Sequence, residues 1–297
     1  MTELPPLPYA EWEPTRTTLH LWAQIVGKVK RASARPKNHW WHVPLYLDVH
    51  GLTTRLLPPG FEIRFDFVRN RLVVETAIDE RGFDLVDGLS VAEFDRRLHE
   101  ALGELDVTIL EKPYGVPMTT PFPDDTEHAS YDSEAAGRFW RALEWSADVF
   151  EVFAGWFTGK ESPVHLFWHS FDLAVTRFDG RPAPPMPGAD PVTLEAYCEE
   201  LISFGFWAGD PNVPEAAYYA YVSPAPEGLG EQALPDGARW AEVGASSLAV
   251  LPYDTVREAA DPRAALLDFL EGFYRLGADA AGWDRAALAS NWYPYRG

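Results

Sequence analysis

The sequence predicts an α+β protein with mostly antiparallel sheet and flanking helices, built from two similar halves. Apolar residues recur at helical spacing in some segments and alternate with polar residues in others. A proline-rich stretch near the middle separates two regions in which these elements follow the same order. We therefore expect an N-terminal α+β half over residues 1–112, a linker over 113–131 and a C-terminal α+β half over 132–297, packed as one unit.

The N-terminal half is expected to begin with an extended proline-rich segment followed by a helix. Pro14 suits the first turn of that helix, which runs to about Arg31 with apolar residues at helical spacing. Residues 61–67 alternate between apolar and polar side chains, and residues 72–78 are the expected hairpin partner. A capping box at residues 90–93 then predicts the start of a second helix.

The C-terminal half is expected to begin with a long helix over residues 133–157. Strands are expected at residues 202–207, 218–222 and 247–251. An Asp-Pro pair at residues 261–262 supplies the N-cap and first turn of the last helix. Because both halves show helix, strands and a capped helix in turn, they suggest an internal duplication; chance ordering of common elements is the alternative.

Composition restricts the class of protein. The 297 residues are 46% hydrophobic and include 12 Trp and 17 Phe, which is typical of a folded globular chain. The formal net charge of -20 disfavours binding to nucleic acid and to anionic membrane surfaces. We find no run of roughly 18 apolar residues that could span a membrane and no secretory signal. Cys198 is the one cysteine, so an internal disulfide is excluded, which is compatible with a reducing cytosol. Since neither a secretory signal nor a membrane span is found, a cytoplasmic protein is expected.

Two segments carry most of the side chains suited to chemistry. Residues 38–52 (NHWWHVPLYLDVHGL) and residues 162–181 (SPVHLFWHSFDLAVTRFDGR) each contain a Trp-His pair and an apolar alternation. Pro44 disfavours a helix in the first segment, so we expect a strand there. The second segment is open to both structures: a Ser-Pro pair at its start would cap a helix, whereas its aromatic and β-branched residues favour a strand. We prefer the strand.

This choice determines what the histidines of the second segment can do. In a helix, His165 and His169 would lie one turn apart and could share a metal ion. In a strand they would lie about 13 Å apart and could not. Asp172 would then project from the opposite face of the strand from both histidines.

The predicted site is an aromatic-lined cleft between the halves. Imidazole and carboxylate groups are suited to proton transfer, so the candidate catalytic residues are His42, His169 and Asp172. The candidate substrate-binding residues are Trp41, Tyr46, Trp168 and Arg177. A divalent transition metal is an open option, for which the candidate ligands are His39, His42, His165 and His169. For each histidine the alternative is a neutral core residue.

A basic cluster is unusual in so acidic a chain. The simpler interpretation is a solvent-exposed helix end, where the helix dipole favours cations. The alternative is a contact for an anionic ligand. The cluster consists of Lys28, Lys30, Arg31, Arg35 and Lys37. Common motifs of nucleotide binding, serine hydrolysis and zinc proteolysis are absent.

Four stretches together resemble an uncharacterised bacterial family, largely actinobacterial, known only as a domain of unknown function. They are EPTRTTLHLWAQIVGKVK, NHWWHVPLY, DTEHASYD and SPVHLFWHSFDLAVTRFDGR. The resemblance spans nearly the whole chain and implies no activity. We therefore hypothesise, from residue chemistry alone, an enzyme acting on a small molecule with His and Asp groups, with or without a metal. The alternative is a non-catalytic module that binds a small ligand or a protein and has structural histidines; the oligomeric state is open.

Overall fold

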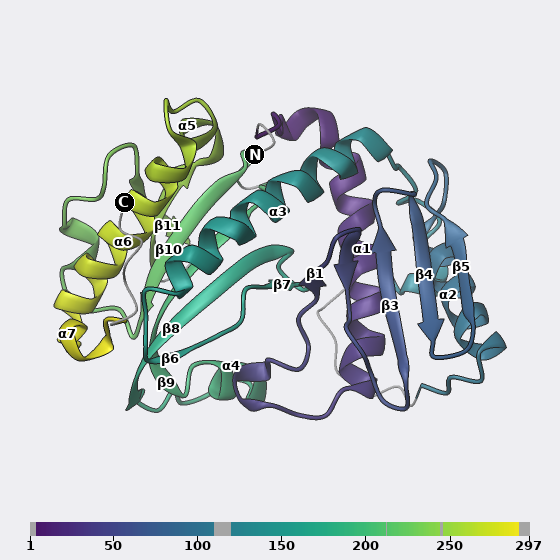
Figure 1. Ribbon diagram of the computed structural model, residues 1–297, viewed down its shortest axis with the longest axis horizontal. Coiled ribbons are helices and arrows are strands. Elements are labelled where there is room, and N and C mark those ends of the chain that lie inside the picture. The colour runs from purple at the N-terminus through teal and green to yellow at the C-terminus, as the bar shows by residue number, and fades with distance from the viewer. Residues whose placement is uncertain (1–3, 110–119, 212, 244–245, 291–297) are drawn as a thin grey trace.

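The computed structural model describes residues 4–109, 120–211, 213–243 and 246–290 (Figure 1). Within these residues two sheets lie side by side, and every strand pair in them is antiparallel. Helices pack on both sheets, so the predicted α+β class with antiparallel sheet and flanking helices is confirmed. No helix in the described part of the chain is both long and apolar enough to cross a membrane.

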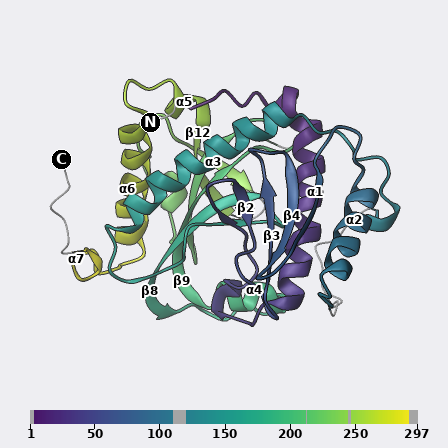
Figure 2. The ribbon, with the colours of Figure 1, turned by 45° about the vertical axis from the view of Figure 1, so that its right-hand side comes forward.

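The first sheet is a meander of five strands in sequence order. Its strands are β1 (Tyr46–Leu47), β2 (Gly51–Thr53), β3 (Phe61–Asp66), β4 (Arg71–Thr76) and β5 (Glu80–Asp84). Helices α1 (Tyr9–Ser33) and α2 (Val91–Glu104) stand against it (Figure 2). Trp22 of α1 stacks on Phe94 of α2 with ring centroids 5.0 Å apart, and Phe94 stacks on Phe65 of β3 at 5.9 Å. Aromatic packing therefore fixes both helices to this sheet.

The second sheet has the order β11-β12-β10-β9-β8-β6, with β7 also paired to β8. Its strands are β6 (Lys160–Glu161), β7 (His165–Phe167), β8 (Asp172–Pro182), β9 (Glu199–Trp207), β10 (Ala217–Ser223), β11 (Arg239–Val243) and β12 (Ser246–Pro252). Helices α3 (Ser133–Ala154) and α6 (Pro262–Ala280) cover one face (Figure 1). Phe204 of β9 lies edge-on to Phe153 of α3 and to Phe273 of α6. The short elements are η1 (Asn38–Trp40), η2 (Phe122–Asp124), α4 (Pro191–Ala196), η3 (Leu229–Glu231), α5 (Tyr253–Arg257) and α7 (Arg285–Leu288).

The two segments that the sequence singled out join the sheets. Leu45 and Leu166 exchange two backbone hydrogen bonds of 2.8 Å, which bridge the loop before β1 to β7. The Trp168 indole N–H donates to the carbonyl oxygen of Val43 at 3.0 Å. A single hydrophobic cluster runs through both halves, from Leu4 near the N-terminus to Trp283.

Most locally encoded elements agree with the sequence predictions. The 61–67 and 72–78 hairpin forms as β3 and β4, and the predicted strands at 202–207, 218–222 and 247–251 lie within β9, β10 and β12. The Ser90 hydroxyl accepts the Glu93 N–H at 3.2 Å, which caps α2 as the capping box requires. The prediction for α1 was wrong at its start, because the helix begins at Tyr9 and Pro14 lies inside it. Trp12 is buried, so the apolar stripe of α1 includes this first part of the helix.

The predicted strand in residues 38–52 is wrong over most of its length. His39 and Trp40 both adopt positive φ, 51° and 60°, and form the 3₁₀ turn η1. The chain reaches extended pairing only at β1 and β2, and Val49 between them is 76% exposed. The left-handed residues turn the chain before the alternation begins, and a tight turn ends it: the Asp48 carboxylate accepts the His50 and Gly51 N–H groups at 2.8 Å, and β2 folds back on β1.

Residues 162–181 are neither a single strand nor a helix but the hairpin of β7 and β8. The turn between these strands contains His169 and closes at Phe171, which has φ 61°. His165 therefore lies opposite Ala174 in the sheet, and His169 does not share its strand. The preferred interpretation as one continuous strand was wrong at this turn.

The order of elements in the two halves stays similar, but the sheets differ in strand number and strand order. An internal duplication therefore stays a prediction. Residues 113–119 of the predicted linker lie outside the described residues. The following part packs against α2: Phe122 is buried, and the Asp125 carbonyl accepts the Ala92 N–H at 2.9 Å.

Candidate functional site

A pocket of about 450 Å³ opens where the end of α1, η1 and α4 meet. Residues 31–42 supply most of its wall, and Glu195 of α4 supplies the rest from the C-terminal half. Its lining residues are Arg31, Ala34, Pro36, Lys37, Asn38, Trp40, His42 and Glu195. We call it the junction pocket.

The local sequence explains why the chain turns sharply here. Helix α1 ends at Ser33, and Pro36 prevents its continuation because proline disfavours helical φ and ψ in the residue before it. The chain is extended at Lys37 and then enters η1 with two left-handed residues. Non-glycine residues rarely adopt this conformation, so surrounding contacts must hold them in it.

Basic and aromatic side chains meet in the junction pocket. The His42 ring stacks on Trp40 at 5.1 Å, and the Arg31 guanidinium carbon lies 5.9 Å from the Trp40 ring centroid. The backbone N–H of Lys37 donates to His42 Nδ1 at 3.2 Å. His42 Nδ1 is therefore an acceptor, and Nε2 carries the proton when the ring is neutral.

His39 is buried beside the junction pocket and ties η1 to the C-terminal half. Its backbone N–H donates to Glu195 Oε1 at 3.2 Å, and its Nδ1 lies 3.1 Å from the Ala196 carbonyl oxygen. The Lys160 ammonium lies 2.6 Å from His39 Nε2 and 2.6 Å from Glu199 Oε1. Since a carbonyl only accepts and an ammonium only donates, His39 carries its proton on Nδ1 and accepts at Nε2.

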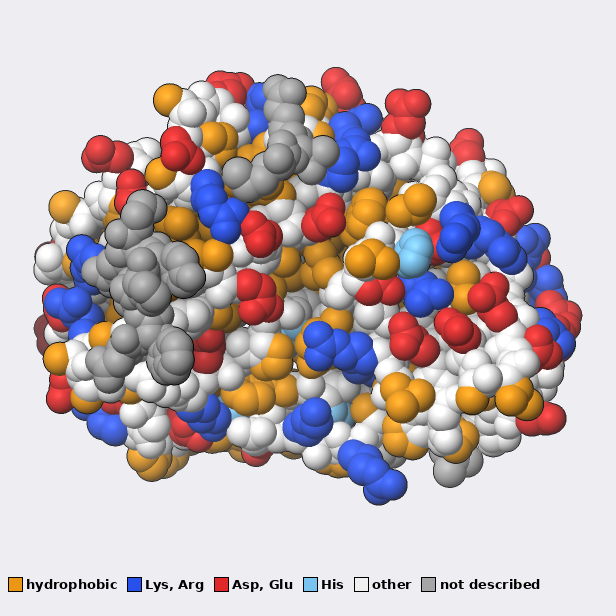
Figure 3. All heavy atoms as spheres, in the orientation of Figure 1, with side chains coloured by type: hydrophobic (Ala, Val, Ile, Leu, Met, Phe, Trp, Pro, Cys, Tyr) orange, Lys and Arg blue, Asp and Glu red, His pale blue; other side chains and the backbone are white. Residues whose placement is uncertain are grey.

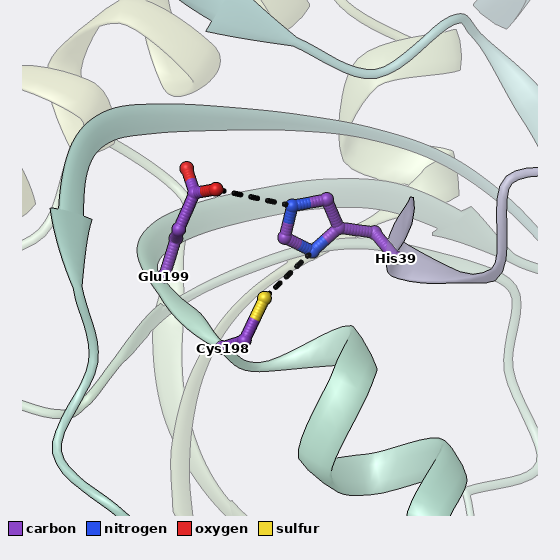
Figure 4. Close-up of side chains that lie close together, drawn as sticks. All are labelled: His39, Cys198 and Glu199. Carbon is purple, nitrogen blue, oxygen red and sulfur yellow. Dashed lines mark hydrogen bonds and ion pairs between the residues drawn. The ribbon is translucent and has the colours of Figure 1, made fainter. Parts of the chain in front are cut away.

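His39 also belongs to the one group of three His, Cys, Asp or Glu side chains that, among the described residues, could hold a metal ion. Its partners are Cys198 and Glu199, with ligand atoms all within 4.8 Å of one another. Figure 4 shows that they approach opposite sides of the ring: Cys198 Sγ lies 3.9 Å from Nδ1, and Glu199 Oε1 lies 3.7 Å from Nε2. A metal ion takes the lone pair of one nitrogen, so both partners cannot ligate it without moving.

Two further features oppose metal binding in this arrangement. The Lys160 ammonium already lies between His39 Nε2 and Glu199 Oε1, where a cation would have to sit. Burial and the Glu195 and Glu199 carboxylates raise the pKa of the Cys198 thiol, an effect that Lys160 opposes. A protonated thiol is a poor ligand and a poor nucleophile. The cluster is best described as a hydrogen-bonded chain from Lys160 through His39 to the Ala196 carbonyl.

We therefore expect Lys160→Ala to create a metal site that the wild type lacks. Removing the ammonium frees His39 Nε2 and the Glu199 carboxylate, and it leaves room for a divalent ion. In a titration with Co²⁺, the visible absorption band should appear at a metal concentration at least tenfold lower for this variant than for wild type. The double variant Lys160→Ala/His39→Gln is the control and should lose the band. Near-stoichiometric metal in wild type purified without chelator, lost in His39→Gln, would contradict this prediction.

A family model described as a family of unknown function, DUF5996, matches residues 4–290. The chain belongs to this family. No curated protein and no solved structure shows a significant match to it. The resemblance seen in the sequence is thus confirmed at the level of the DUF5996 family, and the chemistry must be argued from the residues themselves.

The DUF5996 fold places the other candidate residues at several different points. Trp41 lies against His39 at 5.1 Å and Phe178 at 5.7 Å, with the Lys160 ammonium 5.8 Å from its ring. It therefore lies within the His39 cluster. Trp168 is buried between the halves, where it packs on Gly27 of α1. His165 and Tyr46 lie together, edge-on, at 6.1 Å.

His169 and Asp172 lie at the turn of the β7–β8 hairpin and do not line the junction pocket. His169 is exposed beside Trp168, with ring centroids 6.0 Å apart. The buried Asp172 carboxylate accepts hydrogen bonds from the Ser170 and Tyr219 hydroxyls. Burial, together with the Asp172 charge, raises the pKa of Tyr219 far above its usual range. The hydroxyl is therefore a fixed donor to Asp172.

Arg177, a candidate substrate-binding residue, lies on the helix-covered face of the second sheet. It is 1% exposed, donates to Glu161 Oε2 at 3.2 Å and to the Phe153 carbonyl, and lies 3.5 Å from the Phe153 ring centroid. Burial raises the pKa of Glu161 to about 7, against the opposing effect of Arg177. In this position Arg177 is enclosed by protein.

Sequence reasoning missed Lys160, Glu195, Cys198 and Glu199 as members of the site. One signal was present in the sequence. The chain has only five lysines: three of them lie within residues 28–37, and a fourth is Lys160. A scarce cation in an acidic chain points to a specific partner.

Proposed function

We propose that this DUF5996 protein is an enzyme that binds a small anionic molecule in the junction pocket, with His42 as its acid–base group. The observation that carries the proposal is the convergence of Arg31, Lys37 and His42 with the Trp40 ring in one pocket. A volume of about 450 Å³ suits a metabolite-sized ligand.

The charge distribution supports an anionic ligand. With a net charge of -20, the protein as a whole repels anions, so basic groups gathered at one pocket make it the favourable place for a negative group. On the face of the molecule shown in Figure 3, acidic and basic side chains are interspersed over most of the surface. The Trp40 ring offers an apolar surface for a flat part of the same ligand.

His42 is suited to proton transfer because its orientation is fixed. The Lys37 N–H holds Nδ1, so Nε2 is the nitrogen that gives or takes a proton. The second candidate function is binding without catalysis. It is favoured by the Cys198 thiol, which has a raised pKa and does not offer an activated nucleophile beside the pocket. We expect either function to operate in the cytoplasm, where a single thiol stays reduced.

The binding test uses benzoate and phenyl phosphate as probes, followed by calorimetric titration. We expect at least one probe to bind wild type, and Lys37→Ala to weaken it about tenfold or more, as expected for loss of a charge-assisted contact. Trp40→Asn, which tolerates the left-handed conformation, should also weaken binding. Arg35→Ala is the matched control because Arg35 is exposed and does not line the pocket. Equal affinities in Lys37→Ala and wild type would refute this site.

Catalysis is tested separately from binding. Wild type is incubated with a mixture of carboxylate and phosphate metabolites, and products are followed by ¹H and ³¹P NMR. We expect His42→Gln to bind the ligand but to lose turnover, because the amide cannot transfer a proton. Turnover that survives in His42→Gln would exclude its acid–base role. Binding without turnover in wild type would favour the non-catalytic function.

A further inference from the structure

A second group of cations lies around the ring of Tyr46, a buried residue of β1 in the first sheet. The Lys30 ammonium of α1 lies 4.6 Å from the ring centroid, and the Arg55 guanidinium carbon, from the loop after β2, lies 3.5 Å from it. The ring of His165 from β7 lies edge-on at 6.1 Å. We call these four residues the Tyr46 cluster. None of them lines the junction pocket.

Charge in this cluster is poorly compensated. Lys30 is 3% exposed, and its ammonium donates to the Thr54 carbonyl oxygen at 2.8 Å. Among the described residues no carboxylate lies within 4.0 Å of either the Lys30 ammonium or the Arg55 guanidinium. Glu62, the acidic group that acts on Lys30, accepts from the Thr53 hydroxyl at 2.6 Å and lies 3.8 Å from Arg64. Its charge is thus shared with other partners.

His165 adds an unsatisfied donor. It is completely buried, and neither ring nitrogen has a hydrogen-bond partner among the described residues. One nitrogen of a neutral imidazole always carries a proton, and leaving that donor buried and unpaired is unfavourable. Its other ring neighbour is Phe167 at 4.6 Å, which offers no acceptor oxygen or nitrogen. A buried donor thus packs on the same tyrosine ring as two cations that have no carboxylate within 4.0 Å among the described residues.

We propose that the Tyr46 cluster binds one small anion, chloride or an oxyanion such as phosphate, between Lys30, Arg55 and His165. The ammonium and the imidazole N–H supply the inner hydrogen bonds, and the exposed Arg55 supplies charge from the solvent side. The anion would satisfy the lone imidazole donor and compensate both cations at once. This site is distinct from the junction pocket, since Lys30 and Arg31 are successive helix residues that project about 100° apart.

The electrostatics of the cluster agree with this proposal. Burial, with repulsion from Arg55 and Lys37, lowers the pKa of Lys30 to about 7, while Glu62 opposes the shift. Burial, with Lys30 and Arg55, lowers the pKa of His165 to about 3. Burial also raises the pKa of Tyr46, against Arg55. An anion would stabilise the protonated form of both bases.

The test measures thermal unfolding of the full chain at pH 6.5 and constant ionic strength. Chloride or phosphate replaces gluconate, a much larger anion. We expect the Tm of wild type to rise by about 5 °C at a concentration near one hundred times the dissociation constant. Arg55→Asn should remove most of this rise. It is a conservative choice because Arg55 is exposed and has φ 57°, which asparagine accepts.

Three further variants complete the design. Lys30→Met should also lose the dependence on the anion. Arg35→Asn, which removes an exposed charge elsewhere, should keep it. Lys37→Ala, which impairs the junction pocket, should keep most of the rise in Tm with the anion. Failure of the anion site and failure of the junction pocket can therefore be told apart. No anion-specific rise in wild type, or an equal rise in Arg55→Asn and Lys30→Met, would overturn the Tyr46 anion site.

Discussion

Replacing Lys30 with methionine is expected to raise the free energy of unfolding at pH 6, in gluconate buffer, by up to about 5 kcal/mol. The pKa of this lysine falls from 10.5 to about 7 in the folded protein. Each unit corresponds to 1.36 kcal/mol, so holding the buried ammonium charged at pH 6 costs about 5 kcal/mol relative to the unfolded chain. Methionine fills a similar volume without charge, and it forgoes a hydrogen bond to Thr54 worth about 1 kcal/mol.

The sign of the pH dependence follows from the lowered pKa. Below pH 7 the lysine is charged in both states and the full penalty is present. Between pH 7 and 10.5 the folded protein releases its proton while the unfolded chain keeps it, so wild type gains stability as pH rises. The advantage of Lys30→Met should therefore shrink by about 3 kcal/mol between pH 6 and pH 9.5.

Urea unfolding at these two pH values measures the effect. Arg35→Met serves as control because Arg35 is exposed and is not among the charges that act on Lys30, and it should change the free energy of unfolding by less than about 0.5 kcal/mol at either pH. A Lys30→Met variant that is less stable than wild type at pH 6 in gluconate would mean that the cation is already compensated. A smaller advantage in chloride than in gluconate would agree with the proposed anion site.

The elements that the sequence predicted correctly are those encoded by neighbouring residues. The β3–β4 hairpin, the Ser90 cap and the Asp261 cap each depend on side chains within a few positions of one another. The two segments that matter most failed for a common reason, namely turns inside the expected strands, such as the one at Asp48 between β1 and β2. His39 and Trp40 turn the chain at the start of the first segment, and Phe171 closes the turn in the second. Residues of these types rarely adopt positive φ, so pattern reasoning extends strands through them.

The candidate site was predictable only in part because its contacts are distant in sequence. His39 meets Lys160 across 121 positions and Ala196 across 157. No spacing rule connects such residues. Arg177 was a different failure, since period-two alternation already placed it on the same face of the strand as Leu173 and Val175. That face packs against α3, so the pattern indicated a buried ion pair and not a ligand contact.

Trp168→Ala is expected to lower the free energy of unfolding by about 3–5 kcal/mol, the usual effect of emptying a buried tryptophan site. The indole is 4% exposed, packs on α1 at Gly27 and donates to the Val43 carbonyl oxygen. It thus joins the hairpin turn, α1 and the loop before β1, which are the parts that bring the two halves together. Urea unfolding measures the loss, and a change below 1 kcal/mol would contradict this role.

Gly27 provides a sharper version of the same test, because the effect of an added methyl group should change sign. In wild type a Cβ at position 27 would lie 2.2 Å from Trp168 Cδ2, so Gly27→Ala must displace the indole and destabilise the protein. Once Trp168→Ala has removed the ring, the same methyl group fills part of the cavity and gains helix propensity of about 1 kcal/mol. Gly27→Ala should then stabilise the variant.

Gly137→Ala in α3 is the matched control for helix propensity alone. A Cβ there meets nothing closer than Arg141 at 3.5 Å, so it should stabilise both backgrounds by about 1 kcal/mol. We expect Gly27→Ala to change the free energy of unfolding in opposite directions with and without Trp168, whereas Gly137→Ala should change it in the same direction in both backgrounds. This result would show that the contact between α1 and the hairpin turn couples the two positions. If Gly27→Ala has the same sign in both backgrounds, the indole does not pack on this face of α1, and the joint between the halves must depend on the Leu45–Leu166 bridge instead.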